Sequence, residues 1–399
     1  MLRSGWWGVE KWLAWRVGVG AKRGEVGITI DHCKPAFLGG FRFRDWVELL
    51  TTPGRGVDGE YVPRAMVATL LTMVTSVLAR FEPEAVLSGE QEEAWERPVF
   101  VLGLPRSGTS LLHQLLSRNP GLCYASKADC YNPHVLVLMR QLGLDRMMTG
   151  LNPARRRFMD GVLTGWSLPE EESMAMGILT GVGVRVDSIF GNPLRDTVWW
   201  PVPPEHFAVE WVGAMRAFSR KLAMVHGVPA VFKSPGNTTL IPWILKVFPR
   251  ARFVMIFRHP FGQFRSLVTV DRKRDDGGGW NALRRRGKIS GEEVAAYGGG
   301  VVERYFATCG QVPEGRLCEV RYEDLVSDPG GVLGRIHGEL GIPGGDEVVA
   351  GLAEDAVFRE YRSNRHPELA CGEKEMVRRH FASVFAHCEY DAGVADCGE

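Results

Sequence analysis

The stretch GLPRSGTS at positions 103–110 constrains the fold more than any other part of the sequence. It follows the apolar run PVFVLG, which predicts a buried strand. It leads into SLLHQLLSR, whose leucines recur on one helical face until Asn119 and Pro120 end the helix. A strand, a glycine turn and a helix in this order are typical of a phosphate-binding α/β unit, because the turn and the helix amino end present backbone amides to an anion.

The turn differs from a Walker loop in one informative position. It has the G-x-x-x-x-G frame and a terminal hydroxyl, but Thr109 stands where a Walker loop has lysine. Without that lysine, the cation that reaches the β- and γ-phosphates of a Mg-triphosphate is missing. We therefore expect the turn to hold one phosphate, with Arg106 as the compensating cation; a glycine turn that binds nothing is the weaker alternative. The residues expected at this phosphate are Pro105, Arg106, Ser107, Gly108, Thr109 and Ser110.

Strands and helices alternate through the rest of the chain. Strand-like apolar runs lie at 229–233, 252–257 and 317–322, and Asn237 is expected to cap a helix between the first two. This order predicts an α/β fold of the P-loop nucleotide-binding type, in which helices flank both faces of a mainly parallel central sheet.

The expected domain organisation follows from the same pattern. Residues 1–95 are predicted to form a helical amino-terminal extension that includes a helix at 63–81, and residues 96–395 the catalytic domain. Within that domain, a largely helical insertion at about 134–226 is expected on the acceptor side. The charged, glycine-rich segment 272–288 is predicted to be a surface loop, either a solvated linker or a substrate lid.

Composition excludes several classes of protein. The 399 residues are 45% apolar and 24% charged, a globular balance, and the formal net charge of +1 offers no overall field to attract nucleic acid. The eight cysteines show no metal-ligand spacing, so we expect reduced thiols and no metal site. Charged residues interrupt the apolar runs before they reach the ~18 residues of a membrane span, which favours a soluble, cytoplasmic protein. Residence in the Golgi is the alternative.

A second region completes a pattern that resembles a known family. Arg258 follows the run RFVMIF, and Ser266 follows it eight residues later, so that a guanidinium and a hydroxyl can converge on one phosphate. Together with LPRSGTSLLHQLL, this spacing resembles sulfotransferases that use 3′-phosphoadenosine 5′-phosphosulfate (PAPS), in particular the arginine variant of tyrosylprotein sulfotransferases and of bacterial and algal homologues. The resemblance covers about residues 97–390. It implies that the turn holds the phosphosulfate and that Arg258 and Ser266, with Arg362 as a further candidate, hold the 3′-phosphate.

The resemblance also implies a catalytic set and no metal. Arg106 is expected to neutralise the leaving oxygen, with Lys233 assisting. The run LPEEES at 168–173 resembles an acidic segment that faces the acceptor in these relatives, so we expect Glu171, and after it Glu170, to be the base. The alternative is that the acidic run is the solvated first turn of a helix. His113 is a rival base, although a histidine in its position is more often packed in a core.

The function predicted from these residues is transfer of a sulfuryl group from PAPS to a hydroxyl or amine of a small-molecule or saccharide acceptor. Nucleic acid is not expected as a partner. One alternative is a small-molecule kinase with an atypical phosphate loop, for which Glu319, Glu323 and Asp324 are the nearest magnesium-binding acids. The other is a nucleotide-binding module without catalysis.

Overall fold

The computed structural model describes residues 36–156, 161–191, 205–274, 282–285, 289–352 and 367–393. A five-stranded sheet lies at its centre in the order β2-β5-β1-β6-β7, and every neighbouring pair is parallel. The predicted α/β class with a mainly parallel central sheet is therefore confirmed. The strands are β1 (Val99–Leu102), β2 (Cys123–Tyr124), β5 (Ala230–Lys233), β6 (Arg252–Phe257) and β7 (Leu317–Arg321).

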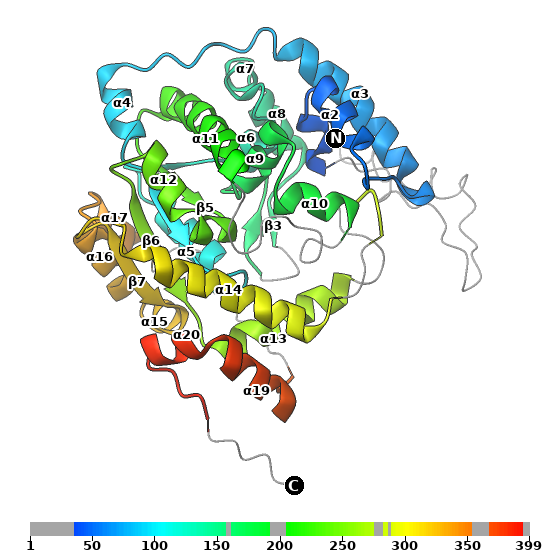
Figure 1. Cartoon of the computed structure of the whole chain (residues 1–399). Helices are drawn as coiled ribbons and strands as arrows, with labels where there is room; N and C mark the ends of the chain where they lie inside the picture. The colour runs from blue at the N-terminus through cyan, green and yellow to red at the C-terminus, as the bar shows by residue number, and fades with distance from the viewer. Residues whose placement is uncertain are drawn as a thin grey trace, which may run out of the picture.

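Helices cover both faces of this sheet (Figure 1). Because side chains alternate along a strand, Val99 and Val101 of β1 enter one core, and Phe100 and Leu102 enter the other. Burial on both faces explains why β1, β5 and β6 are nearly continuous apolar runs, whereas β7 alternates buried and half-buried residues. The first core is closed by α5 (Thr109–Leu116), α15 (Tyr322–Ser327), α16 (Pro329–Glu339) and α17 (Gly345–Gly351), and the second by α11 (Glu205–His226), α12 (Ile241–Val247), α14 (Gly291–Cys309) and α19 (Cys371–His380).

The position of β1 brings the predicted site residues to one edge. β1 lies between β5 and β6, with Val101 opposite Lys233 and Leu102 opposite Met255. Such a point in a parallel sheet opens a crevice at the carboxyl ends of the strands, where ligands bind in this class of fold. The turn after β1, Lys233 at the end of β5 and Arg258 after β6 all meet at this crevice edge.

The amino-terminal part is helical. It comprises η2 (Ala36–Gly40), α2 (Phe43–Thr51), η3 (Gly59–Tyr61), α3 (Val62–Leu78) and α4 (Gly89–Trp95), and α3 is the helix expected at 63–81. By length and mean hydropathy of 1.4, Gly59–Leu78 is the one described helical stretch that would suit a membrane span, and 33% of its apolar window is buried. Arg64 within it is buried and donates a hydrogen bond of 2.6 Å to the carbonyl of Ala282, so α3 is docked on the rest of the protein.

The segment before α11 combines short helices with a small hairpin that the sequence did not indicate. β3 (Arg155–Arg156) pairs antiparallel with β4 (Leu163–Thr164). The helices around it are α6 (Lys127–Tyr131), α7 (Leu136–Gln141), α8 (Leu144–Leu151), α9 (Ser173–Thr180) and α10 (Val184–Phe190). The remaining helices of the chain are α13 (Pro260–Arg274) and α20 (Ala382–His387). Residues 275–281 and 286–288 of the predicted surface loop lie outside the described residues.

The prediction that Asn237 caps a helix is wrong. A 3-10 turn, η4 (Pro235–Thr239), starts two residues earlier, and α12 begins only at Ile241. Pro242 explains the split, since a proline lacks the amide that a helix interior needs and is favoured in the first turn. Asn237 lies inside η4, and its side-chain amide donates to Glu172 at 2.7 Å.

Candidate active site

The turn at 103–108 has a backbone that few residues can adopt. Gly103 and Gly108 have φ angles of 144° and 100°, and Arg106 itself lies in the left-handed region at 72°. A Cβ atom on Gly108 would stand 2.4 Å from Cδ2 of Tyr322, so a side chain has no room there. The conformation therefore requires glycine at 108, and it places a strained arginine at the tip of the turn.

Neighbouring segments hold the turn in this shape. The amide of Gly103 donates to Oγ1 of Thr238 at 2.9 Å, and Nε2 of Gln263 donates to the carbonyl of Pro105 at 3.0 Å. The hydroxyl of Ser107 is buried and donates to the carbonyl of Leu104 at 2.8 Å. The turn is thus preorganised by the segments after β5 and β6, and Ser107 contributes to its shape.

The second predicted phosphate region lies directly against the turn. Although 160 residues separate them, Nε of Arg106 donates to Oγ of Ser266 at 3.0 Å. Nη1 of Arg258 donates to the carbonyl of Arg106 at 2.9 Å, and its guanidinium lies 4.4 Å from the ring centroid of Tyr322. The residues expected to hold two different phosphates therefore lie in direct contact, and the side chain of Ser266 is buried at this contact.

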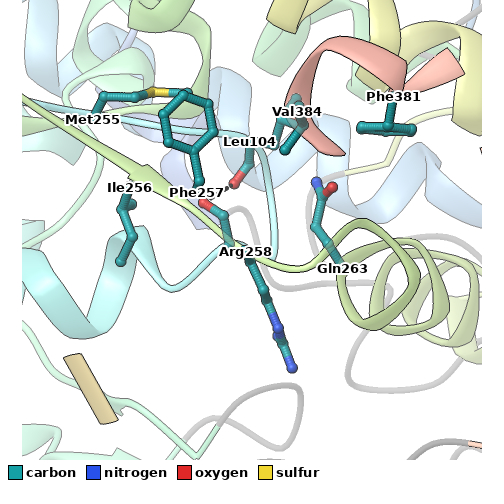
Figure 2. A pocket seen from close by; sticks show the side chains of 9 residues that line it. Leu104, Met255, Ile256, Phe257, Arg258, Gln263, Phe381 and Val384 are labelled. Carbon is teal, nitrogen blue, oxygen red and sulfur yellow. Dashed lines mark hydrogen bonds between the residues drawn. The ribbon is translucent and has the colours of Figure 1, made fainter. Parts of the chain in front are cut away.

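Figure 2 shows the residues that line a small space beside the turn. A space of about 10 Å³ lies between Leu104, the end of β6 and the carboxyl-terminal helices, where Phe381 and Val384 pack. That volume is near the minimum for one water molecule, so the space is a packing gap and not a nucleotide pocket. Arg258 extends away from these apolar side chains, as the figure shows.

The acidic run at 170–172 contains residues with different environments. Glu172 is 1% exposed, and its carboxylate accepts hydrogen bonds from the amide of Lys233 at 3.0 Å and from Asn237. Burial raises the pKa of Glu172 despite these bonds. These contacts hold the acidic segment against β5 and η4 and so stabilise the fold. The alternative of a solvated first turn does not describe this residue.

Glu171 stands between two cations. Its Oε1 lies 2.6 Å from Nζ of Lys233, and its Oε2 pairs with the guanidinium of Arg185 on α10. Nζ of Lys233 also donates to Oγ of Ser110 at 3.2 Å, so one ammonium connects the phosphate turn with the carboxylate. Because Glu171 and Lys233 are 8% and 3% exposed, this pair is largely removed from solvent, where charges interact more strongly than in water.

Glu170 is half-buried and has different contacts from Glu171. Its backbone amide donates to the carbonyl of Ala125 at 3.0 Å, and its Oε1 accepts a hydrogen bond from the amide of Glu171 at 3.1 Å. Of these two neighbouring acids, Glu171 is therefore the one whose carboxylate contacts Lys233.

His113 lies in the core beneath the turn. It is 2% exposed on α5, and its Nε2 is 3.3 Å from the carbonyl of Val231. Burial, together with the charge of Lys233, lowers the pKa of His113 to about 3. A neutral, packed imidazole with this pKa is a poor proton acceptor, so the structure favours the packing interpretation of His113 over its role as a rival base. Arg362, the remaining candidate for the 3′-phosphate, lies outside the described residues.

Several site residues were not singled out from the sequence. Arg185, Thr238 and Gln263 belong to no motif, and only the fold brings them to the turn. Tyr322 carried a weak signal, because it opens the segment YEDL directly after a strand. Its ring stacks on Arg258 and fills the space beside Gly108.

Two of the three acids considered for magnesium have other partners. Glu319 accepts a hydrogen bond from the hydroxyl of Tyr305 and pairs with Nε2 of His387. Glu323 accepts from the amide of His259 at 3.1 Å and from the hydroxyl of Tyr390 at 2.8 Å. These contacts pack the carboxyl-terminal segment against β7 and α15, which does not favour the kinase alternative.

Comparisons with known proteins all find similarity to sulfotransferases. A model described as the sulfotransferase family matches residues 98–346. Omega-hydroxy-beta-dihydromenaquinone-9 sulfotransferase Stf3 of Mycobacterium tuberculosis is 24% identical over 369 residues, covering 88% of this chain and 90% of the relative. Among solved structures, sulfotransferase STF9 of Mycobacterium avium has a TM-score of 0.56 at 17% identity, with 92% and 98% of the two chains covered. STF1 of M. tuberculosis has a TM-score of 0.52 at 18% identity, with 89% and 98% covered.

Proposed function

The chain belongs to the sulfotransferase family, and from this premise we propose that it takes the sulfuryl group from PAPS and leaves adenosine 3′,5′-bisphosphate. The observation that carries the proposal is the direct contact between the turn at 103–110 and the pair Arg258 and Ser266. A donor with phosphates at two positions of one adenosine needs two anion-binding groups that are separate in sequence and adjacent in space. Backbone amides of the turn serve the phosphosulfate, and Arg258 with Ser266 serves the 3′-phosphate.

Catalysis then uses the cations and the acid at the crevice edge. In the transfer, an acceptor oxygen forms a bond to sulfur, the bond between sulfur and the bridging oxygen breaks, and the leaving bisphosphate keeps the electron pair. Arg106 and Lys233 stabilise the negative charge that develops on that oxygen, and Glu171 takes the acceptor proton. Lys233 supports both tasks, since its Nζ contacts Ser110 of the turn and the carboxylate of Glu171.

The acceptor is proposed to be a hydroxyl of a small, largely apolar molecule. The name of the relative Stf3 identifies a hydroxylated menaquinone as its acceptor, and that relative matches this chain along 88% of its length. A half-buried Trp166 precedes the acidic segment and packs edge-on against Tyr131 at 5.7 Å, so aromatic side chains lie beside the segment that carries Glu171. Trp211, by contrast, is a core residue of α11.

A cytoplasmic location is part of the proposal. The six cysteines in the described part of the chain are free thiols, and three of them, Cys123, Cys130 and Cys318, are buried. Free thiols of this kind suit a reducing compartment.

One titration tests the donor. Adenosine 3′,5′-bisphosphate should raise the unfolding midpoint in a concentration-dependent manner, because a ligand that binds the folded state alone stabilises it. ATP with Mg²⁺ at the same concentration should have little effect. A larger shift with ATP and Mg²⁺ would overturn the donor assignment. Transfer of label from PAPS to a panel of phenols, sterols, hydroxylated quinones and saccharides then tests the acceptor class.

A further inference from the structure

Four arginine side chains meet at the edge of the sheet opposite the phosphate turn. Arg97 precedes β1, Arg250 and Arg252 flank the start of β6, and Arg316 precedes β7. They line a cavity with a volume of about 240 Å³, which we call the arginine cavity. None of the residues proposed for sulfuryl transfer lines it.

The sheet itself fixes the positions of these arginines. The amide of Arg252 donates to the carbonyl of Pro98 at 2.9 Å, and the amide of Phe253 donates to the carbonyl of Arg316 at 2.8 Å. Arg97, Arg252 and Arg316 therefore sit at the starts of three adjacent strands, which are about 4.8 Å apart in a sheet. Backbone pairing keeps the three side chains close together, although their charges repel.

Carboxylates balance part of this charge. Arg97 pairs with Glu93, and Arg250 pairs with Glu96 at 3.2 Å. Arg252 donates to the carbonyl of Gly341 at 3.3 Å, and Arg316 donates to the carbonyl of Pro249. Carbonyl oxygens accept hydrogen bonds but carry no net charge, so these contacts set two carboxylates against four guanidinium groups. Positive charge therefore exceeds negative charge among the residues that line the cavity and their partners.

The electrostatic cost of this arrangement is visible at Arg252. Burial is the largest cause that lowers the pKa of Arg252, and the charges of Arg97, Arg316 and Arg250 lower it further. An anion in the cavity would remove this cost, since each guanidinium presents a planar pair of donors that matches the oxygens of a phosphate.

We propose that the arginine cavity binds a small multivalent phosphate oxyanion of the size of inorganic diphosphate. The volume is below the 300–1,000 Å³ that is typical of pockets for drug-sized ligands, which favours a compact anion over a whole nucleotide. Four guanidinium groups favour an anion with several charges over a monovalent one.

The test is a calorimetric titration of the full chain with inorganic diphosphate, with NaCl added to keep the ionic strength constant. Arg316→Gln should raise the dissociation constant by about tenfold, because one charge-assisted contact is lost. Arg250→Gln, at a side chain that is 42% exposed, should act in the same direction without touching the contact between Arg316 and Pro249.

Two controls separate this site from other effects. Arg335→Gln removes an exposed arginine of α16 that pairs with Glu339, and it should bind diphosphate as the wild type does. Saturating adenosine 3′,5′-bisphosphate fills the proposed donor site, and diphosphate should bind with the same affinity in its presence. Equal affinities in the wild type, Arg316→Gln and Arg250→Gln would overturn the proposal, as would a loss of diphosphate binding when adenosine 3′,5′-bisphosphate is present.

Discussion

The carboxylate of Glu171, which we propose as the base, lies between two cations. Lys233 links it to the phosphate turn, and Arg185 holds its other oxygen from α10. A base must be deprotonated before it acts, and two cations favour the deprotonated form.

Glu171→Gln should reduce kcat by about 10²–10⁴-fold, the usual contribution of a general base. The amide keeps the shape of the side chain, so binding of adenosine 3′,5′-bisphosphate should change little. Transfer of labelled sulfate and a thermal titration measure the two quantities separately. Glu170→Gln is the matched control and should retain most of the activity; an active Glu171→Gln variant would place the base elsewhere.

Arg258 is proposed to make two contacts, and one substitution should remove both. Arg258→Ala loses the proposed contact to the 3′-phosphate and the hydrogen bond to the carbonyl of Arg106. Loss of a charge-assisted contact of this kind costs about 1.5–3 kcal/mol, which weakens bisphosphate binding by at least about tenfold. Calorimetry measures this loss. Arg265→Ala, one residue before Ser266 on α13, is the neighbouring control, and equal affinity in the two variants would contradict the assignment.

At the scale of elements, the turn between β1 and α5 depends on glycine. Gly108→Ala should destabilise the protein by about 3 kcal/mol, because alanine is strained at a φ of 100° and its methyl group would meet the ring of Tyr322. Gly334→Ala on α16, where nothing lies within 4 Å of the added carbon, should instead stabilise the helix by about 0.5–1 kcal/mol. Chemical denaturation measures both changes, and similar values for the two variants would refute the role of the turn.

The sequence predicted the elements whose patterns are local. Continuous apolar runs identified β1, β5 and β6, because strands buried on both faces carry no polar alternation, whereas β7 at the sheet edge alternates buried and half-buried residues. The two-residue strand β2 and the hairpin β3–β4 are too short to show a pattern. The cap predicted at Asn237 failed because Pro242 moved the helix start to Ile241. Motifs also singled out Arg106, Arg258 and Glu171, whose roles stay predictions. The contact of Arg185 with Glu171 depends on how α10 packs and has no sequence signal.

For the molecule as a whole, the two edges of the sheet carry different charge patterns. The carboxyl edge combines Lys233 and Arg106 with the carboxylate of Glu171, whereas the amino edge gathers the arginine cavity. The net charge of +1 does not reveal either cluster of charges, because it is a sum over the whole chain and does not depend on where the charged residues lie in space. Parallel pairing determines the position of the arginine cavity, since it aligns the starts of β1, β6 and β7 on one side of the sheet.

Global stability should depend on pH through two buried histidines. Burial lowers the pKa of His113 and of His134 to about 3 in the folded protein, whereas an unfolded histidine titrates near 6.5. The unfolded state therefore binds more protons between these values. Their contribution to stability is complete above pH 6.5, and it is lost as the pH falls toward 3, at about 1.4 kcal/mol per pH unit for each histidine.

Urea unfolding of the wild type and of His113→Gln between pH 7 and pH 4 measures this dependence. The variant lacks one titrating group, so its free energy of unfolding should fall less steeply as the pH decreases. The slope against pH should differ from that of the wild type by the equivalent of about one proton, whatever the stability of the variant at pH 7. His134→Gln should act in the same way, and the double variant should lose about two protons from the slope, because the histidines lie on different elements, α5 and the segment before α7. An identical slope in the wild type and His113→Gln would show that the imidazole beneath the phosphate turn titrates in the folded protein as it does in the unfolded chain. That result would return His113 to consideration as a proton acceptor.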